Sequence, residues 1–183
     1  MKFHWIKNNA RSYLNVRSDL NVIPNKYLYT TVNDNDIHPS AKSSCTFEKG
    51  RHFCVLRKPR LGAYTLLALV DENKNNDKWE ENGEIGIFNG YPEEKYGHIF
   101  TENLGILIDM DKKKCVFYDY DRKTKKKIRY KKNEESFEDY EAPIIFKKTK
   151  IFVWIKRDGC NKGRKGITIL NEGCIPIPDW VKD

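Results

Sequence analysis

The feature of this sequence that most constrains its fold is a succession of short apolar runs separated by Gly, Pro, Asn and Asp. Runs of this kind, rich in β-branched and aromatic residues, are strand signals. No helical pattern lies between them, and the connections leave no room for the crossover helices that a parallel sheet needs. About ten such strands predict an all-β fold, an antiparallel two-sheet β-sandwich of jelly-roll type with few or no helices. The expected strands are Ser12–Val16, Tyr27–Val32, His52–Leu56, Tyr64–Val70, Glu84–Phe88, Leu104–Asp109, Cys115–Tyr120, Lys127–Tyr130, Pro143–Phe146, Ile151–Ile155 and Gly166–Leu170.

The length of 183 residues favours one structural unit with a sizeable core. Aromatic residues make up 13% of the chain, whereas disordered chains are poor in them. Lys and Arg number 34 against 26 Asp and Glu, which gives a net charge of +8. That charge permits an anionic partner, although abundant lysine that keeps the surface soluble explains it more simply.

The cysteines suggest neither a disulfide framework nor a zinc site, because their number is odd and no Cys-x-x-Cys pair occurs. Reduced thiols in a cytoplasmic protein fit best. The N-terminal residues lack the apolar segment of a signal peptide, and the longest apolar run, Tyr64–Val70, is too short to cross a bilayer. We therefore expect no membrane association, no metal and no cofactor. The five cysteines are Cys45, Cys54, Cys115, Cys160 and Cys174.

A strongly basic segment runs from Lys112 to Lys132 and contains eleven Lys or Arg residues. Apolar residues alternate in its first part, which predicts two strands joined by a tip at Asp121–Thr124. The acidic segment Asn133–Glu141 follows directly, and we expect it to lie beside the basic strands and to neutralise part of their charge. Each such surface pair contributes only about 0–1 kcal/mol.

Six motifs, taken in order, resemble those of PRY-SPRY domains of the B30.2 type, found at the C-terminus of tripartite-motif proteins and butyrophilins. The resemblance implies a PRY-like segment at residues 1–45 and a SPRY domain at residues 46–183. The chain departs from the family at scaffold positions, such as Cys54-Val55-Leu56 where the family has Trp-Glu-Val, so it resembles a divergent member. The motifs are Ser44–Phe53, Glu81–Gly83 followed by Ile85–Tyr91, Leu104–Asp109, Lys114–Asp119, Gly166–Leu170 and Pro178–Trp180. Tyr64–Val70 lies where the family has a buried strand.

The resemblance implies a protein-interaction module that recognises a partner protein or peptide through loops at one end of the sandwich. It further implies a place in innate immunity or ubiquitin-ligase targeting, and no catalysis. Core packing is an equally good explanation for Phe88, and half-buried packing a better one for Trp154. The candidate ligand-binding residues are Trp79, Gly86, Phe88, Asn89, Tyr91 and Trp154.

The basic segment supports an alternative, the binding of RNA or a phosphorylated small ligand. Tyr118, Tyr120 and Tyr130 are interleaved with cations there, and stacking combined with phosphate contacts suits single-stranded RNA. The neighbouring acidic segment argues against this alternative because it competes for the same cations. The candidate residues are Arg122, Lys123, Lys125, Lys126, Lys127 and Arg129.

Catalysis has little support in the sequence. The four histidines are scattered, and no nucleophile elbow, zinc-protease helix motif or phosphate-binding loop is present. Asp109 and Asp111 could suggest a pair of catalytic carboxylates, but acids in a tight turn between strands are expected to be solvated.

Overall fold

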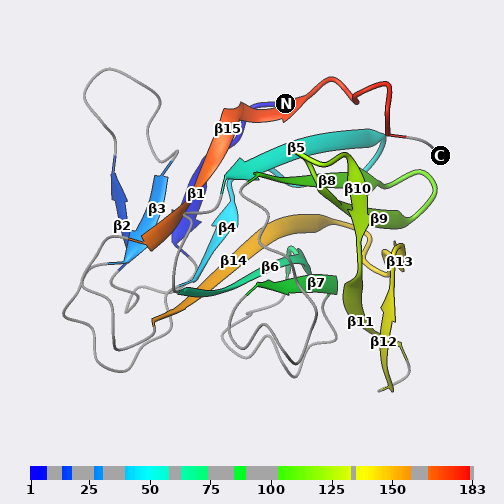
Figure 1. The fold of residues 1–183 in the computed structure, drawn as a ribbon, viewed down its shortest axis with the longest axis horizontal. Helices are drawn as coiled ribbons and strands as arrows, with labels where there is room; N and C mark the ends of the chain where they lie inside the picture. Colours follow the sequence, from blue (N-terminus) through cyan, green and yellow to red (C-terminus); the bar gives the residue numbers. More distant parts are fainter. Residues whose placement is uncertain are drawn as a thin grey trace.

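Two antiparallel sheets stacked on one another make up the protein (Figure 1). This computed structural model describes fifteen strands and, within the residues it describes, no helix. The all-β prediction is therefore confirmed. None of the described residues belongs to a helix long and apolar enough to cross a membrane. The described residues are 1–7, 14–17, 27–30, 40–57, 63–73, 85–89, 103–132, 135–157 and 165–181.

The first sheet has seven strands, and both its edges are formed by short strands. Its central strand pairs are the longest, with nine matched residue pairs between β14 and β6. In order across the sheet, the strands are β1 (Trp5–Lys7), β4 (Ser40–Ser43), β14 (Thr149–Arg157), β6 (Ala63–Asp71), β7 (Ile85–Asn89), β11 (Ile128–Lys132) and β12 (Glu135–Asp139).

The second sheet has eight strands and includes the C-terminal strand. Residues 1–45 supply strands to both sheets, with β1 and β4 in the first and two further strands in the second. In order, the strands are β10 (Thr124–Lys126), β9 (Lys114–Asp119), β8 (Asn103–Asp109), β5 (Arg51–Arg57), β15 (Lys165–Ile175), β3 (Tyr27–Thr30) and β2 (Leu14–Arg17), with β13 (Ala142–Pro143) paired to β9.

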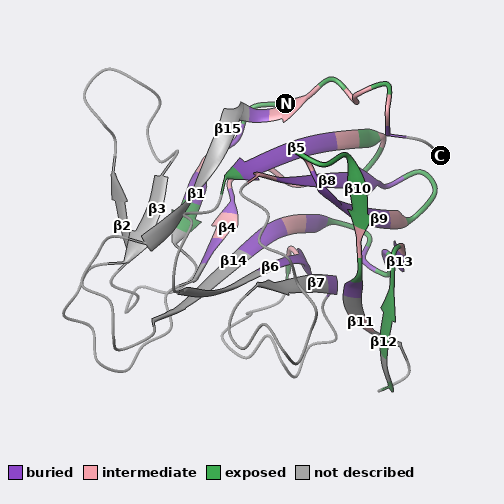
Figure 2. Cartoon of the chain, viewed as in Figure 1, coloured by how far each residue is buried: buried purple, intermediate pink, exposed green. Residues whose placement is uncertain are grey.

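The main core lies between the two sheets and follows the alternation of each strand. On β8, Leu104, Ile106 and Ile108 face this core, and on β9 Phe117 does. These positions recur every second residue, as expected for strands with one face on a core. Figure 2 shows buried residues concentrated in β5, β8, β9 and β14, with exposed residues on β10 and β12.

A second, smaller apolar layer lies on the other face of the eight-stranded sheet. It is made by the alternate residues of β5, β8 and β9 and is covered by residues 176–181, which we call the C-terminal clasp. Trp180 lies 5.4–6.0 Å, between ring centroids, from Phe53, Tyr118 and Tyr120. Figure 1 shows the chain leaving β15 and running above β5. The layer contains Phe53, Val55, Leu107, Val116, Tyr118 and Val181, with Tyr120, Ile175, Ile177 and Trp180 packed against it.

The turn between β8 and β9 is held by two aspartates with different partners. Asp109 is fully buried, accepts the N–H of Lys112 at 2.8 Å and pairs with Nε of Arg51 at 3.1 Å. Asp111 is exposed and accepts the N–H of Gly50 at 2.7 Å. The expectation that both acids are solvated is therefore wrong for Asp109, because its carboxylate caps the turn and pairs with an arginine.

The turn between β9 and β10 repeats this arrangement ten residues later. Asp119 accepts the N–H of Arg122 at 2.9 Å, and Asp121 accepts the N–H and the side-chain amide of Asn103 at 3.3 and 2.9 Å. Each turn is thus fastened to the strand beside it. Both turns contain a lysine in the left-handed region, Lys113 (φ 52°) and Lys123 (φ 57°).

The expected basic hairpin is only partly confirmed. Its first strand is β9, and the tip and the antiparallel pairing with β10 are as predicted. The second strand is divided, however: β10 stays in the eight-stranded sheet, whereas β11 pairs with β7 and β12 in the seven-stranded sheet. The chain crosses from one sheet to the other at Lys127, as Figure 1 shows at the edge of the sandwich.

The predicted strand Pro143–Phe146 is wrong beyond its first residue. Only Ala142–Pro143 pairs with β9. The N–H of Ile144 then donates to the carbonyl of Lys113 in the turn, at 2.8 Å, and the ladder ends. Strands β1, β4 and β12 were not expected, because they are short or polar and lack an apolar alternation.

Candidate partner-binding face

The pairing of the seven-stranded sheet places three of the predicted ligand-binding positions on one face. Phe88 is in register with Leu66, and Leu66 with Trp154, so these positions form one row across β7, β6 and β14. Gly86 is in the neighbouring row, opposite Ala68. Opposed residues in an antiparallel sheet share a face, and so do residues two apart along a strand.

This face is the one turned away from the main core. Leu67, Leu69 and Ile151, at the alternate positions of β6 and β14, belong to the core between the sheets. Phe152 and Ala68, which share the row of Gly86, are 0% and 1% exposed. Ala68 and Phe152 are therefore packed within the protein. Phe88 and Trp154 belong to the next row, which lies two residues nearer to the ends of β7 and β14. We call the face with these two rows the outer face.

The remaining predicted residues do not gather there. Asn89 is in register with Thr65 and so falls on the opposite face from Phe88. Trp79 and Tyr91 lie outside the described residues. Their segments nevertheless join β7 at opposite ends, before Ile85 and after Asn89, about 13 Å of strand apart. The structure thus separates the attachment point of the Trp79 segment from that of the Tyr91 segment.

The end of the sheet nearest Phe88 and Trp154 collects several connections. The segments 31–39, 58–62, 90–102 and 158–164 each join the sheet there, at the ends of β4, β6, β7 and β14. A sheet whose strand ends carry many connections is the usual support for a binding surface.

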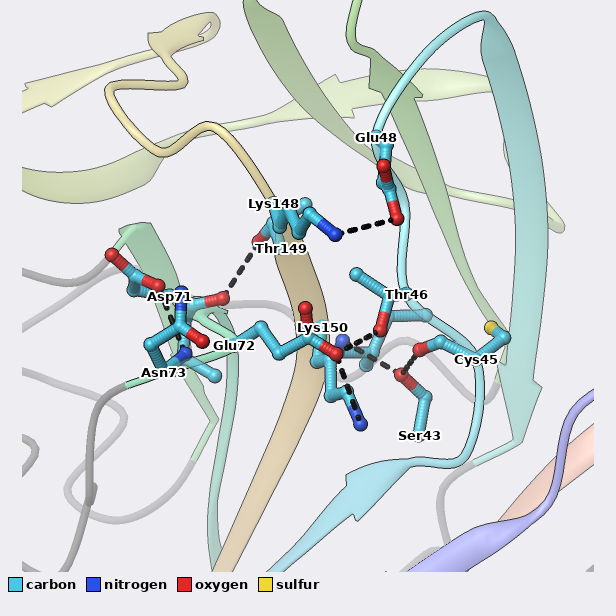
Figure 3. A network of polar contacts seen from close by, with 12 residues as sticks. Ser43, Cys45, Thr46, Glu48, Asp71, Glu72, Asn73, Lys148, Thr149 and Lys150 are labelled. Carbon is cyan, nitrogen blue, oxygen red and sulfur yellow. Dashed lines mark hydrogen bonds and ion pairs between the residues drawn. The ribbon is translucent and has the colours of Figure 1, made fainter.

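The attachment point of the Trp79 segment is held by a polar network at the other end of β6 (Figure 3). The carboxylate of Glu72 accepts a hydrogen bond from Oγ1 of Thr46 at 2.6 Å and lies 3.9 Å from Nζ of Lys150. Oγ1 of Thr149 donates to the carbonyl of Val70 at 2.9 Å. The network therefore ties β6 to β14 and to the connection that precedes β5.

A buried serine completes this network. Oγ of Ser43 donates to the carbonyl of Cys45 at 2.9 Å and accepts the N–H of Ile151 at 3.1 Å. At its exposed margin, Lys148 pairs with Glu48 at 3.1 Å, and this contact raises the pKa of Lys148. Sequence reasoning missed the network, because polar residues next to turns give no signal of long-range pairing.

The residues predicted for anion binding are distributed over both sheets. Arg122 and Lys123 lie in the turn after β9, Lys125 and Lys126 in β10, and Arg129 in β11. The turn and β10, which carry four of these residues, lie at the edge of the eight-stranded sheet, and the chain changes sheets at Lys127.

Part of the basic charge is already neutralised, as predicted. Glu141 accepts a hydrogen bond from Nζ of Lys125 at 2.6 Å and lies 3.7 Å from Nζ of Lys114. The hydrogen bond from Lys125 lowers the pKa of Glu141. Burial lowers the pKa of Lys126. The acidic strand β12 also pairs with β11 along its length.

Among the described residues, no group of three or more His, Cys, Asp or Glu side chains is placed to hold a metal ion.

No protein-family model and no curated protein matches the sequence. Two solved structures do resemble the fold. The TRIM65 PSpry domain, known from a crystal structure, gives a TM-score of 0.51 at 8% identity over 93% of each chain. Stonustoxin gives 0.55 at 8% identity over 92% of this chain, which corresponds to only 28% of the stonustoxin chain. The protein therefore has a SPRY-like β-sandwich fold, and at this identity the likeness concerns the fold alone.

Proposed function

We propose that the protein is a recognition module that binds a partner protein or peptide through the outer face and the connections at the end of the sheet nearest Phe88 and Trp154. The observation that carries the proposal is the row formed by Phe88, Leu66 and Trp154 on the face turned away from the core. Large apolar and aromatic residues are the usual anchors of protein interfaces. The SPRY-like fold and the sequence resemblance to PRY-SPRY domains support the same role.

The binding surface we propose includes only some of the candidate residues. Phe88, Tyr91 and Trp154 belong to strands or connections at one end, whereas the Trp79 segment is attached at the other. Gly86 supports the face through its backbone, since its row neighbours Ala68 and Phe152 are buried. Non-enzymatic action and a place in ubiquitin-ligase targeting or innate immunity are predictions that follow from the sequence resemblance, and a cytoplasmic location is a prediction that follows from the cysteine pattern.

The test is capture of partners on the immobilised full chain, with quantitative mass spectrometry of the retained proteins. We expect Phe88→Ala and Trp154→Ala each to reduce the retained partner at least about tenfold, as for an interface anchor whose loss costs 1.4 kcal/mol or more. Circular dichroism and thermal unfolding of each variant establish that the sandwich is intact.

The matched control is Phe137→Ala. Phe137 is an aromatic residue on β12 of the same sheet, is 37% exposed and stacks on Tyr130 at 5.6 Å between ring centroids. We expect this variant to retain the partner at the level of the unmodified protein. Equal loss with Phe137→Ala, or full retention with both outer-face variants, would show that the partner binds elsewhere.

A further inference from the structure

Two cysteines face one another where the C-terminal strand approaches its end. Cys54 on β5 and Cys174 on β15 are direct partners in the antiparallel ladder. Cys54 is completely buried, whereas Cys174 is partly exposed. Both thiols are free. The pair therefore combines one thiol that solution reagents can reach with one that contacts only the protein interior.

The type of ladder position decides how close the two side chains lie. The N–H of Cys174 donates to the carbonyl of Met1 at 2.9 Å, on the side away from β5. Along an extended strand, the N–H and C=O of one residue point to the same side, so Cys174 does not exchange backbone hydrogen bonds with Cys54. The two cysteines thus form a non-hydrogen-bonded pair.

Non-hydrogen-bonded pairs have the shorter of the two cross-strand spacings, about 4.5 Å between Cα atoms. A disulfide requires a Cα separation of about 4.4–6.8 Å. The pair therefore falls within the range that a disulfide can bridge without a change of strand register.

The surroundings also favour a reaction at Cys174. A hydrogen bond from Cys54 lowers the pKa of Cys174, whereas burial raises the pKa of Cys54. Cys45 lies in the same region and packs against the same core, but burial raises its pKa to about 12. Because the thiolate is the nucleophile in thiol–disulfide exchange, Cys174 reacts first.

We propose that Cys54 and Cys174 form a reversible cross-strand disulfide by exchange with a small disulfide such as oxidised glutathione, and that this bond fastens the base of the C-terminal clasp. The clasp begins two residues after Cys174, and Phe53, beside Cys54, lies under Trp180 at 6.0 Å between ring centroids. The bond thus joins the two strands at the point where the clasp departs from the sheet.

The exchange proceeds in two steps. The thiolate of Cys174 attacks one sulfur of oxidised glutathione, and one glutathione leaves as a thiolate and takes up a proton. The thiol of Cys54 then gives up its proton and attacks the sulfur of Cys174, which releases the second glutathione. In total, the two protein thiols lose two electrons and two protons, and these reduce one oxidised glutathione to two glutathione molecules.

The experiment is incubation of the full chain in glutathione redox buffer, followed by alkylation of free thiols and non-reducing tryptic mapping. We expect the His52–Arg57 and Gly166–Lys182 peptides to be joined at least about tenfold more than any other pair, as the shared ladder position requires. The map is unambiguous because trypsin places every cysteine in a different peptide. These peptides are Ser43–Lys49, His52–Arg57, Cys115–Arg122, Asp158–Lys162 and Gly166–Lys182.

Two variants and a second readout complete the test. Cys174→Ser, at a partly exposed position, should abolish the joined peptide, and the matched variant Cys45→Ser should leave it unchanged. Hydrogen exchange at residues 175–181 should slow at least about threefold in the oxidised protein if the bond holds the clasp. A dominant Cys45–Cys174 link, the absence of any intramolecular link, or unchanged exchange in the clasp would each overturn the proposal.

Discussion

Among single residues, Gly105 shows how closely the layer beneath the clasp is packed. A Cβ atom at this position would lie 2.6 Å from Cζ of Phe53, and the ring is itself fully buried against Tyr118, Tyr120 and Trp180. We expect Gly105→Ala to lower the free energy of unfolding by about 1–3 kcal/mol, since the ring has no free space into which to move. Urea unfolding measures the change.

The same substitution in a Phe53→Leu background distinguishes this clash from a general effect of alanine in a strand. Leucine lacks the ring atom that a Cβ at Gly105 would approach. The additional loss caused by Gly105→Ala should therefore shrink in that background, as in a double-mutant cycle of contacting residues. An equal loss in both backgrounds would contradict the explanation.

Lys123 illustrates the opposite case, a residue whose backbone conformation suits another amino acid better. Its φ of 57° is in the left-handed region, which costs a residue with a Cβ about 1–2 kcal/mol. Glycine removes this cost but adds about 0.5–1 kcal/mol of unfolded-chain entropy. We expect Lys123→Gly to raise the free energy of unfolding by up to about 1 kcal/mol, measured by urea unfolding.

Arg122→Gly is the control for this stabilisation, since it adds glycine to the same exposed turn outside the left-handed region. This variant should be destabilised, because it acquires the entropy of glycine and loses the 3.8 Å ion pair with Asp119. Stabilisation by both variants would indicate a general preference of the turn for glycine, unrelated to φ.

Among the strands and turns, Glu141 couples the acidic segment to the edge of the eight-stranded sheet. Its hydrogen bond with Lys125 lowers its pKa in the folded protein. A depressed folded pKa stabilises the protein above the pKa of the unfolded glutamate, about 4.3, and the stabilisation disappears as the pH falls through the folded value. We expect Glu141→Gln to cost about 0.2–1 kcal/mol at pH 7 and almost nothing near pH 2, since the pair is at the surface.

Denaturation of both proteins at the two pH values measures the difference. Glu135→Gln, on strand β12 of the other sheet, is the reference for removal of an acidic charge from the same segment. A loss that is the same at pH 7 and at low pH would rule out the ion pair as its source.

The sequence predicted those strands whose central residues form an apolar run, and the reason is physical. β5, β8 and β9 pack on the main core with one face and on the layer beneath the clasp with the other, so their central residues are apolar and buried at successive positions. β12 has the sequence Glu-Ser-Phe-Glu-Asp, and its place in the sheet comes from pairing with β11 rather than from burial. Such a strand cannot be recognised from the pattern of its own residues.

The turns were predicted in position but not in detail. The repeated Asp-x-Asp order at residues 109–111 and 119–121 was present in the sequence. The structural role of these aspartates depends on partners from elsewhere in the chain, Gly50 for one turn and Asn103 for the other. These two contacts join residues 61 and 18 positions apart. Asp109 likewise pairs with the distant Arg51, so local sequence could not reveal that it is buried and paired.

In the molecule as a whole, the pairing of strands within each sheet determines which of the predicted site residues come together. Phe88 and Trp154 are 66 residues apart in sequence, and they share a row only because β6 pairs with both β7 and β14. The family resemblance was needed to select these two positions. The basic residues, by contrast, lie close together in sequence, and the chain carries them from β10 of one sheet to β11 of the other.

The position of the basic residues on the strands leads to a prediction about nucleic acids. A single strand of RNA placed along β10 meets Lys125, which is paired with Glu141, and Lys126, whose pKa burial lowers. Binding of a short polyuridine, followed by fluorescence anisotropy, should therefore engage about one or two phosphates. The slope of log affinity against log salt should be about −0.7 to −1.4, because each phosphate contact in a single strand contributes about −0.7.

Reversal of charge at Lys125, Lys126 and Lys127 should then change the affinity for polyuridine by less than about tenfold, and it should leave the binding of a partner at the outer face unchanged. A salt slope steeper than about −2.8 would require four or more phosphate contacts, and hence contacts to further cations such as Arg122 and Lys123 in the neighbouring turn. If the charge-reversed protein also lost that steep slope, the basic residues would be the primary binding site. The proposal that the outer face is the primary binding site would then be wrong.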